Sequence, residues 1–92
     1  MITPSNLVRH ELIGLRVKIV SGANKTCIGI DGRVVDETRN MLFIEKKNGK
    51  VVKVVKKDYI FLFTLPSGKH VKVNGELIVG RPEDRIKKRL KI

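Results

Sequence analysis

Apolar residues alternate with polar ones along much of the chain, and this pattern predicts a series of short β-strands. Leu15, Val17 and Ile19 are separated by basic residues, which is the period-two spacing of a strand with one buried face. Further runs of this kind, bounded by turn residues, occupy 27–37, 41–46, 51–55, 59–65, 69–73 and 76–79. Five or six short strands drawn from these seven runs, with tight turns and no helix between them, predict an all-β fold, a small antiparallel barrel.

Turns and bends within the predicted sheet have recognisable sequence signals. Gly29 and Gly32 fall inside the run at 27–37, where they would permit the strongly bent strand that closes a small sheet into a barrel. Asn48-Gly49 lies between two apolar runs, which predicts a type I′ β-hairpin at that point.

Short helices are predicted at both ends of the chain. Thr3 can cap an N-terminal helix, Pro4 suits its first position, and Gly14 can end it. At the C-terminus, residues 83–92 begin with acids and end with bases, which is the order that the helix dipole favours. 

The length of the chain allows one domain. A second hydrophobic core could not be built from what the first would leave of 92 residues. We therefore divide a single domain into an N-terminal helical segment (1–14), a barrel (15–80) and a C-terminal helix (81–92).

Composition predicts a soluble, cytoplasmic protein. The hydrophobic fraction of 41% supports a core, while the sequence has no apolar run near 18 residues and no signal-peptide pattern at its N-terminus. Cys27 is the single cysteine and cannot form an internal disulfide, which fits a reducing compartment. One cysteine and two histidines also lack the ligands of a structural zinc site, so we expect the protein to bind no metal or cofactor itself.

Charge is unevenly distributed along the sequence. The net charge is +11, from 20 Lys and Arg against 9 Asp and Glu, which predicts a polyanionic partner. Residues 46–57 contain six lysines and no acid, for +6, and residues 81–92 contain six bases and two acids, for +4. This clustering predicts a defined nucleic-acid footprint.

The residues predicted to contact RNA phosphates come from the lysine-rich hairpin, the strand at 69–73 and the C-terminal segment. They are Lys46, Lys47, Lys50, Lys53, Lys56, Lys57, Lys69, Lys72, Arg81, Arg85, Lys88 and Arg89. Two alternatives remain: hairpin lysines can simply block edge-to-edge aggregation, and C-terminal bases can simply complement a helix dipole. The few aromatic residues fall inside apolar runs, so we expect recognition of the shape and backbone of folded RNA rather than base-by-base stacking.

Candidates for catalysis are few. His10 and His70 could act as acid and base, but a lone histidine is more often a surface or capping group. Asp31, Asp36 and Glu37 could hold a metal, although their positions at a bend and a turn favour structural use. No phosphate-binding loop, nucleophile triad or metal-ligand spacing occurs, so no catalytic residues are predicted.

Taken in order, the sequence motifs resemble one known family. They are Thr3-Pro4 with Asn6-Leu7, then 9–14 (RHELIG), 29–40 (GIDGRVVDETRN), a lysine-rich hairpin, 65–68 (LPSG) and 80–85 (GRPEDR). This order and spacing, over essentially the whole chain, is similar to the archaeal ribonuclease P protein component 1 family.

The resemblance implies an Sm-like barrel and a role in removing the 5′ leader of precursor tRNA. In that family the RNA subunit carries the Mg²⁺-dependent cleavage, and this protein supports RNA folding and activity together with other proteins, above all the zinc-ribbon protein component 4. The resemblance also implies that residues of the N-terminal helix and the bent strand contact the zinc-ribbon partner. These candidate residues are Leu7, Val8, Glu11, Leu12, Arg33, Val35 and Glu37.

Two other kinds of function remain open at this stage. A ring-forming Sm-like RNA chaperone or a ribosomal protein could use the same small barrel, and a homo-oligomeric mass would favour the ring. A stand-alone ribonuclease would cleave RNA by itself and would lose that activity when His10 or His70 became alanine.

Overall fold

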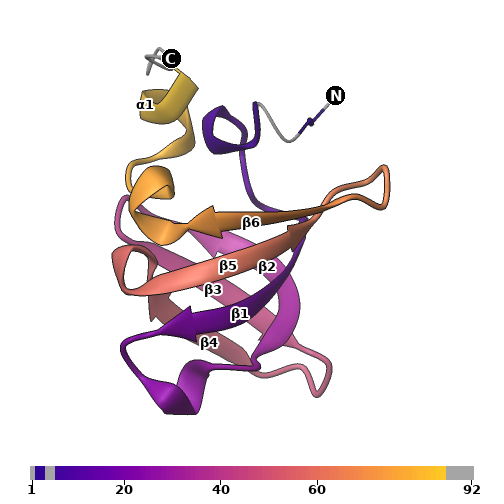
Figure 1. The fold of residues 1–92 in the computed structure, drawn as a ribbon, viewed down its shortest axis with the longest axis vertical. Coiled ribbons are helices and arrows are strands. Elements are labelled where there is room, and N and C mark those ends of the chain that lie inside the picture. Colours follow the sequence, from indigo (N-terminus) through magenta and orange to yellow (C-terminus); the bar gives the residue numbers. More distant parts are fainter. Residues whose placement is uncertain (1, 4–5, 87–92) are drawn as a thin grey trace.

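Six antiparallel strands form one curved sheet in the computed structural model, which describes residues 2–3 and 6–86. The sheet order is β4-β3-β2-β1-β5-β6, and the sheet curls around a single core (Figure 1). The strands are β1 (Arg16–Gly22), β2 (Asp31–Glu37), β3 (Met41–Lys46), β4 (Val51–Val55), β5 (Tyr59–Thr64) and β6 (His70–Asn74). The all-β prediction is therefore confirmed.

Alternating burial along the strands creates the core. In β1, Val17 and Ile19 are buried while Arg16 and Lys18 are exposed. β5 contributes the largest apolar side chains, and Phe61 packs against Phe63 with ring centroids 6.0 Å apart. One face of each strand thus points inward, and the charged strand residues other than Glu37 are left on the outer face.

The curvature comes with irregular strand pairing at two places. The register shifts between Ile19 and Ser21 where β1 pairs with β5, and between Val34 and Asp36 where β2 pairs with β3. Such bulges increase the local twist and bend the strand. Strand β2 is therefore bent as predicted, but at the bulge between Val34 and Asp36 and not at Gly29 or Gly32, and it begins at Asp31 and not at Cys27. The preceding residues form η2 (Lys25–Cys27), a 3₁₀ helix, and a turn at Gly29 with φ +93°.

The β3–β4 and β5–β6 hairpins both turn through a glycine, Gly49 and Gly68. The turn at Asn48-Gly49 is not of the predicted type. None of the described non-glycine residues has a positive φ, whereas a type I′ turn needs one at Asn48. Gly49 has φ +84° and donates its N–H to the Lys46 carbonyl, while Lys46 donates to Lys50. This is a three-residue hairpin loop with a left-handed glycine, so the hairpin prediction is right and its turn type is wrong.

The predicted strand at 76–79 is also wrong. Asn74 ends β6, and its side chain accepts a hydrogen bond from the Glu76 N–H, which starts the 3₁₀ helix η4 (Gly75–Ile78). Gly75 is required at this point, because a Cβ there would lie 1.6 Å from the Lys56 carbonyl oxygen. η4 thereby packs against η3 (Lys56–Asp58), the 3₁₀ turn between β4 and β5.

The N-terminal helix is shorter than predicted, whereas the predicted C-terminal helix is helical over its described residues. The N-terminal segment contains a single 3₁₀ turn, η1 (Leu7–Arg9), and Leu7 and Leu12 are both buried in the core. The C-terminal helix α1 (Pro82–Ile86) packs against η1 (Figure 1). The rest of the predicted C-terminal helix, and Pro4 at the N-terminus, lie outside the described residues. Within residues 2–3 and 6–86, none of the helices has the length and apolar content needed to cross a membrane.

Candidate nucleic-acid interface

Two arginines lie directly opposite each other on the outer face of the sheet. Arg16 on β1 pairs with Arg33 on β2, and both residues are exposed. Like charges at opposed positions of neighbouring strands repel each other and destabilise the sheet. An anion bound between the two guanidinium groups would relieve this repulsion.

The partners that the two arginines have within the protein are weak. Arg16 Nη2 lies 3.8 Å from the Asp31 carboxylate, and both side chains are about half exposed, at 49% and 46%, so solvent screens most of this attraction. Arg33 donates from Nη1 to the Gly14 carbonyl at 3.0 Å. An arginine has five N–H donors, so one such bond leaves most of the hydrogen-bonding capacity of Arg33 for a ligand.

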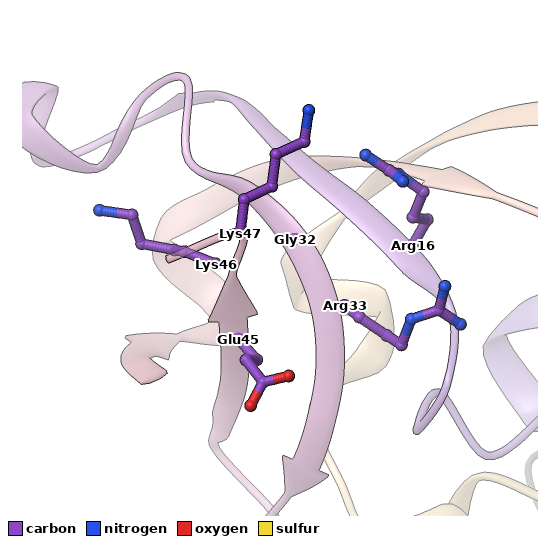
Figure 2. Close-up of a pocket in the computed structure, with 6 residues that line it drawn as sticks. All are labelled: Arg16, Gly32, Arg33, Glu45, Lys46 and Lys47. Atoms are coloured by element: carbon purple, nitrogen blue, oxygen red, sulfur yellow. The ribbon is translucent and has the colours of Figure 1, made fainter. Parts of the chain in front are cut away.

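The arginines line a hollow of about 220 Å³ that continues to the β3–β4 turn. Its other lining residues are Gly32, Glu45, Lys46 and Lys47 (Figure 2). Four cationic side chains against one carboxylate give this basic groove a net charge of +3. At Gly32, strands β2 and β3 lie so close together that a Cβ would be 2.2 Å from the Glu45 carbonyl oxygen. The floor of the groove at this point is therefore backbone without a side chain. The groove is therefore shallow, open and suited to a phosphate backbone.

The lysines predicted to contact RNA are divided among several parts of the surface. Lys46, Lys47 and Lys50 lie at the β3–β4 turn, and the first two line the basic groove. Lys53 is exposed in the middle of β4, and Lys57 is exposed in η3 beyond its far end. Only part of the lysine-rich hairpin therefore lines the groove.

A second cross-strand row carries further exposed lysines. Lys72 on β6 pairs with Leu62 on β5, and Leu62 pairs with Lys18 on β1. Lys69 is exposed in the β5–β6 turn. Arg16 and Lys18 were not among the predicted RNA contacts, although their alternation with apolar residues in β1 places both on the solvent face.

Two residues predicted to contact RNA are instead buried in an ion-pair network. Lys56 and Arg85 are fully buried, and both bind the same carboxylate oxygen, Oε1 of Glu37. Lys56 Nζ also donates to the carbonyl oxygens of Thr38, Arg39 and Gly80, at 2.7, 3.3 and 2.9 Å. Lys56 and Arg85 therefore cannot reach phosphate, and their assignment as RNA contacts is wrong.

Arg85 connects the two ends of the chain through its guanidinium group. Nε donates to the Val8 carbonyl at 2.8 Å, and Nη2 donates to the His10 carbonyl at 2.8 Å. Nη1 donates to the carbonyl oxygens of Ile78 and Gly80. One side chain thus holds the N-terminal segment and the end of η4 against the barrel.

The buried network has two cations and one anion. Burial lowers the pKa of Lys56, while the hydrogen bond and charge of Glu37 act in the opposite direction. None of the buried side-chain nitrogen or oxygen atoms of the described residues lacks a hydrogen-bond partner. The backbone carbonyls that surround the extra positive charge supply the acceptors that a desolvated cation needs.

The same burial corrects part of the predicted partner surface. Leu7 and Leu12 belong to the core, and the side chain of Glu37 is fully buried, so these three cannot form a docking surface. Val8 is half-buried, while Glu11 and Val35 are exposed. Arg33 is exposed but lies in the basic groove. Arg81 is exposed beside η4, whereas Lys88 and Arg89 lie outside the described residues.

The candidates for catalysis have other contacts. His70 Nδ1 lies 3.0 Å from the Thr64 hydroxyl on the neighbouring strand, and the His10 carbonyl accepts from Arg85. Asp31 faces Arg16, while Asp36 accepts a hydrogen bond from the Glu37 N–H. In the described part of the chain, no three His, Cys, Asp or Glu residues are grouped so that they could hold a metal ion.

The fold and the groove define a small, strongly basic, barrel-like β-protein with a basic groove on its outer face. A family model described as Ribonuclease P/MRP, subunit p29 matches residues 5–88. The chain therefore belongs to this family, and it is a protein subunit of ribonuclease P.

Individual relatives match most or all of the chain. A protein of Methanocaldococcus jannaschii named Ribonuclease P protein component 1 is 59% identical over 92 residues, covering 100% of this chain and 96% of its own. A protein of Methanothermobacter thermautotrophicus with the same name is 50% identical, with 99% and 98% of the two chains covered. The solved structure of Mth11, described as a homologue of human RNase P protein Rpp29, has a TM-score of 0.60 at 48% identity and covers 84% of this chain and 99% of its own. These matches confirm the resemblance and favour it over a ring-forming chaperone or a ribosomal protein.

Proposed function

We propose that this protein binds the RNA of ribonuclease P through the basic groove and thereby supports the folding and activity of that RNA. The observation that carries the proposal is the direct opposition of Arg16 and Arg33 on an exposed sheet face, with Lys46 and Lys47 beside them. A planar guanidinium can bind phosphate through two parallel hydrogen bonds. Two guanidinium groups on neighbouring strands can therefore both contact the phosphate backbone of one RNA strand.

Cleavage of precursor tRNA is assigned to the RNA and its Mg²⁺ ions, with this protein as a non-catalytic subunit. The side chains that line the basic groove are cations with a single carboxylate. An arginine has no acceptor and stays protonated in proteins, so it can bind and neutralise phosphate but cannot remove a proton from water. The groove would reduce the electrostatic repulsion between RNA phosphates. Without the protein, a high concentration of magnesium is needed to neutralise these phosphates.

We further propose that the zinc-ribbon protein component 4 docks near Val8, Glu11 and Val35, in the cytoplasm. Val35 is an exposed apolar residue of β2, and Ile13, at 43% exposure, is another in the segment that pairs with β2 through the Gly14–Val34 hydrogen bond. Two exposed apolar side chains, with the exposed Glu11 two residues before Ile13 in the sequence, offer a surface that a partner with complementary charge could bury.

Removal of the two groove arginines tests the proposed RNA contact. Arg16→Gln/Arg33→Gln is expected to weaken binding of ribonuclease P RNA about 10- to 100-fold and to reduce the slope of log K against log salt by about 1.5 to 2, because two phosphate contacts are lost. Filter binding at four salt concentrations measures both quantities. The matched control is Lys57→Gln/Lys69→Gln, which removes the same charge from exposed sites outside the groove. An equal effect of the two double variants would contradict a localised footprint.

A further inference from the structure

A second hollow of about 500 Å³ adjoins the basic groove and shares Lys46 and Lys47 with it. Its remaining lining comes from residues 28–30, between η2 and β2, from Asp31 at the start of β2, and from Asn48 in the β3–β4 turn. This volume lies within the range of about 300–1,000 Å³ that small-molecule sites occupy. The hollow is therefore large enough for a compact organic group.

The chemistry of the second hollow differs from that of the groove. Ile28 is 42% exposed, and Ile30 is partly buried and packs against the core, so one wall offers an apolar surface. The opposite wall offers the two lysines and the Asn48 amide. An apolar wall that faces hydrogen-bonding groups matches a nucleobase, which has apolar faces and polar edges.

Hydrogen bonds hold both walls in place. Gly29 donates its N–H to the Ile19 carbonyl at 2.8 Å, and Ile19 donates to the Ile30 carbonyl at 2.9 Å, so the apolar wall is attached to β1. Asn48 Oδ1 accepts from the Lys50 N–H at 3.0 Å, which fixes the amide group and leaves its two N–H donors for a ligand. A site that is ordered in advance loses little conformational entropy on binding.

We propose that this hollow binds the base of one unpaired nucleotide whose neighbouring phosphates lie in the basic groove. The inference rests on the proposed RNA contact and narrows it to RNA that has a bulged or unstacked nucleotide beside a helical backbone. The shared lysines place the two sites one after the other, as successive parts of one RNA strand require. A paired base cannot enter, because its edges are occupied and its faces are stacked.

The test compares two RNA hairpins of equal length, one fully paired and one with a single bulged 2-aminopurine. The protein is expected to bind the bulged hairpin about fivefold more tightly, at the lower end of what contact between a base and a side chain contributes, because the wall is aliphatic. The emission of 2-aminopurine should change on binding, since the base leaves water. Ile28→Ser should remove the preference and leave binding of the paired hairpin unchanged, which also shows that the variant is folded. Leu77→Ser is the control, because Leu77 is an apolar residue of η4 with 61% exposure and lines neither hollow.

The outcomes separate this inference from the proposed function. Equal affinity for the two hairpins, with binding still weakened by Arg16→Gln/Arg33→Gln, would overturn the nucleotide site and leave the RNA contact in place. A preference that survives Ile28→Ser would also overturn it. Failure to bind either hairpin would overturn both proposals.

Discussion

Replacement of Glu37 by alanine is expected to lower the free energy of unfolding by about 3–5 kcal/mol, because it leaves two buried cations without a counter-charge. Oε1 of Glu37 binds both Lys56 Nζ and Arg85 Nη1, and Oε2 accepts the Leu12 N–H at 3.3 Å. A loss of this size is a large part of the total stability of a domain of 92 residues. Urea denaturation followed by circular dichroism measures it.

Two comparisons test whether the uncompensated charge is the cause. Glu45→Ala removes an exposed carboxylate from the neighbouring strand and should change stability by less than about 0.5 kcal/mol. The triple variant Glu37→Leu/Lys56→Met/Arg85→Met, which removes all three charges together, should be more stable than Glu37→Ala. A Glu37→Ala protein as stable as the parent protein would contradict the buried network.

Gly75→Ala is expected to destabilise the protein by about 3 kcal/mol or to prevent folding, as severe overpacking does. The added Cβ would lie 1.6 Å from the Lys56 carbonyl oxygen and 2.7 Å from that of Tyr59. Both are backbone atoms, so no flexible side chain can move aside, and η3 and η4 would have to separate.

Gly68→Ala provides the comparison for this prediction. Gly68 has φ +89° in the β5–β6 turn, and a Cβ there would meet nothing within 4 Å. Only the cost of the left-handed conformation remains, about 1–2 kcal/mol. Thermal unfolding of both variants measures the difference, and equal midpoints would contradict the close contact between η3 and η4.

The strands were predictable because their apolar residues recur with period two, and the hairpin was predictable from Asn48-Gly49. The strand predicted at 76–79 was wrong because four residues with mixed polarity do not distinguish a strand from a 3₁₀ turn. Here the Asn74 side chain and the tight contact at Gly75 determine the outcome, and neither is visible in a local pattern.

The buried network shows why the candidate site was only partly predictable. Val34 of β2 is buried, and uninterrupted alternation would turn Asp36 inward and Glu37 outward. The bulge between Val34 and Asp36 reverses this order and turns Glu37 into the interior. Arg85, which binds it, is 48 residues away in the sequence. The burial of Lys56 was easier to predict, because Lys56 continues the inward alternation of Val54. The lysines near it in the sequence nevertheless suggested a surface residue.

The groove depended on strand register as much as on residue type. Arg16 and Arg33 are separated by sixteen residues in the sequence, and only the β1–β2 pairing places them opposite each other. Sequence composition identified charge clusters, which favoured the lysine-rich hairpin over isolated arginines. Three-dimensional pairing then joined those arginines to Lys46 and Lys47.

Cleavage of precursor tRNA by reconstituted archaeal ribonuclease P, measured over a range of Mg²⁺ concentrations, tests the central claim most directly. The RNA and the other protein subunits, with the proposed zinc-ribbon partner among them, are assayed without this chain, with it, and with its Arg16→Gln/Arg33→Gln variant. We expect the intact chain to raise the rate at limiting Mg²⁺ and the variant to lose most of that gain, while high Mg²⁺ restores activity. Equal rates in all three reactions at limiting Mg²⁺ would contradict a role for the groove in supporting the RNA.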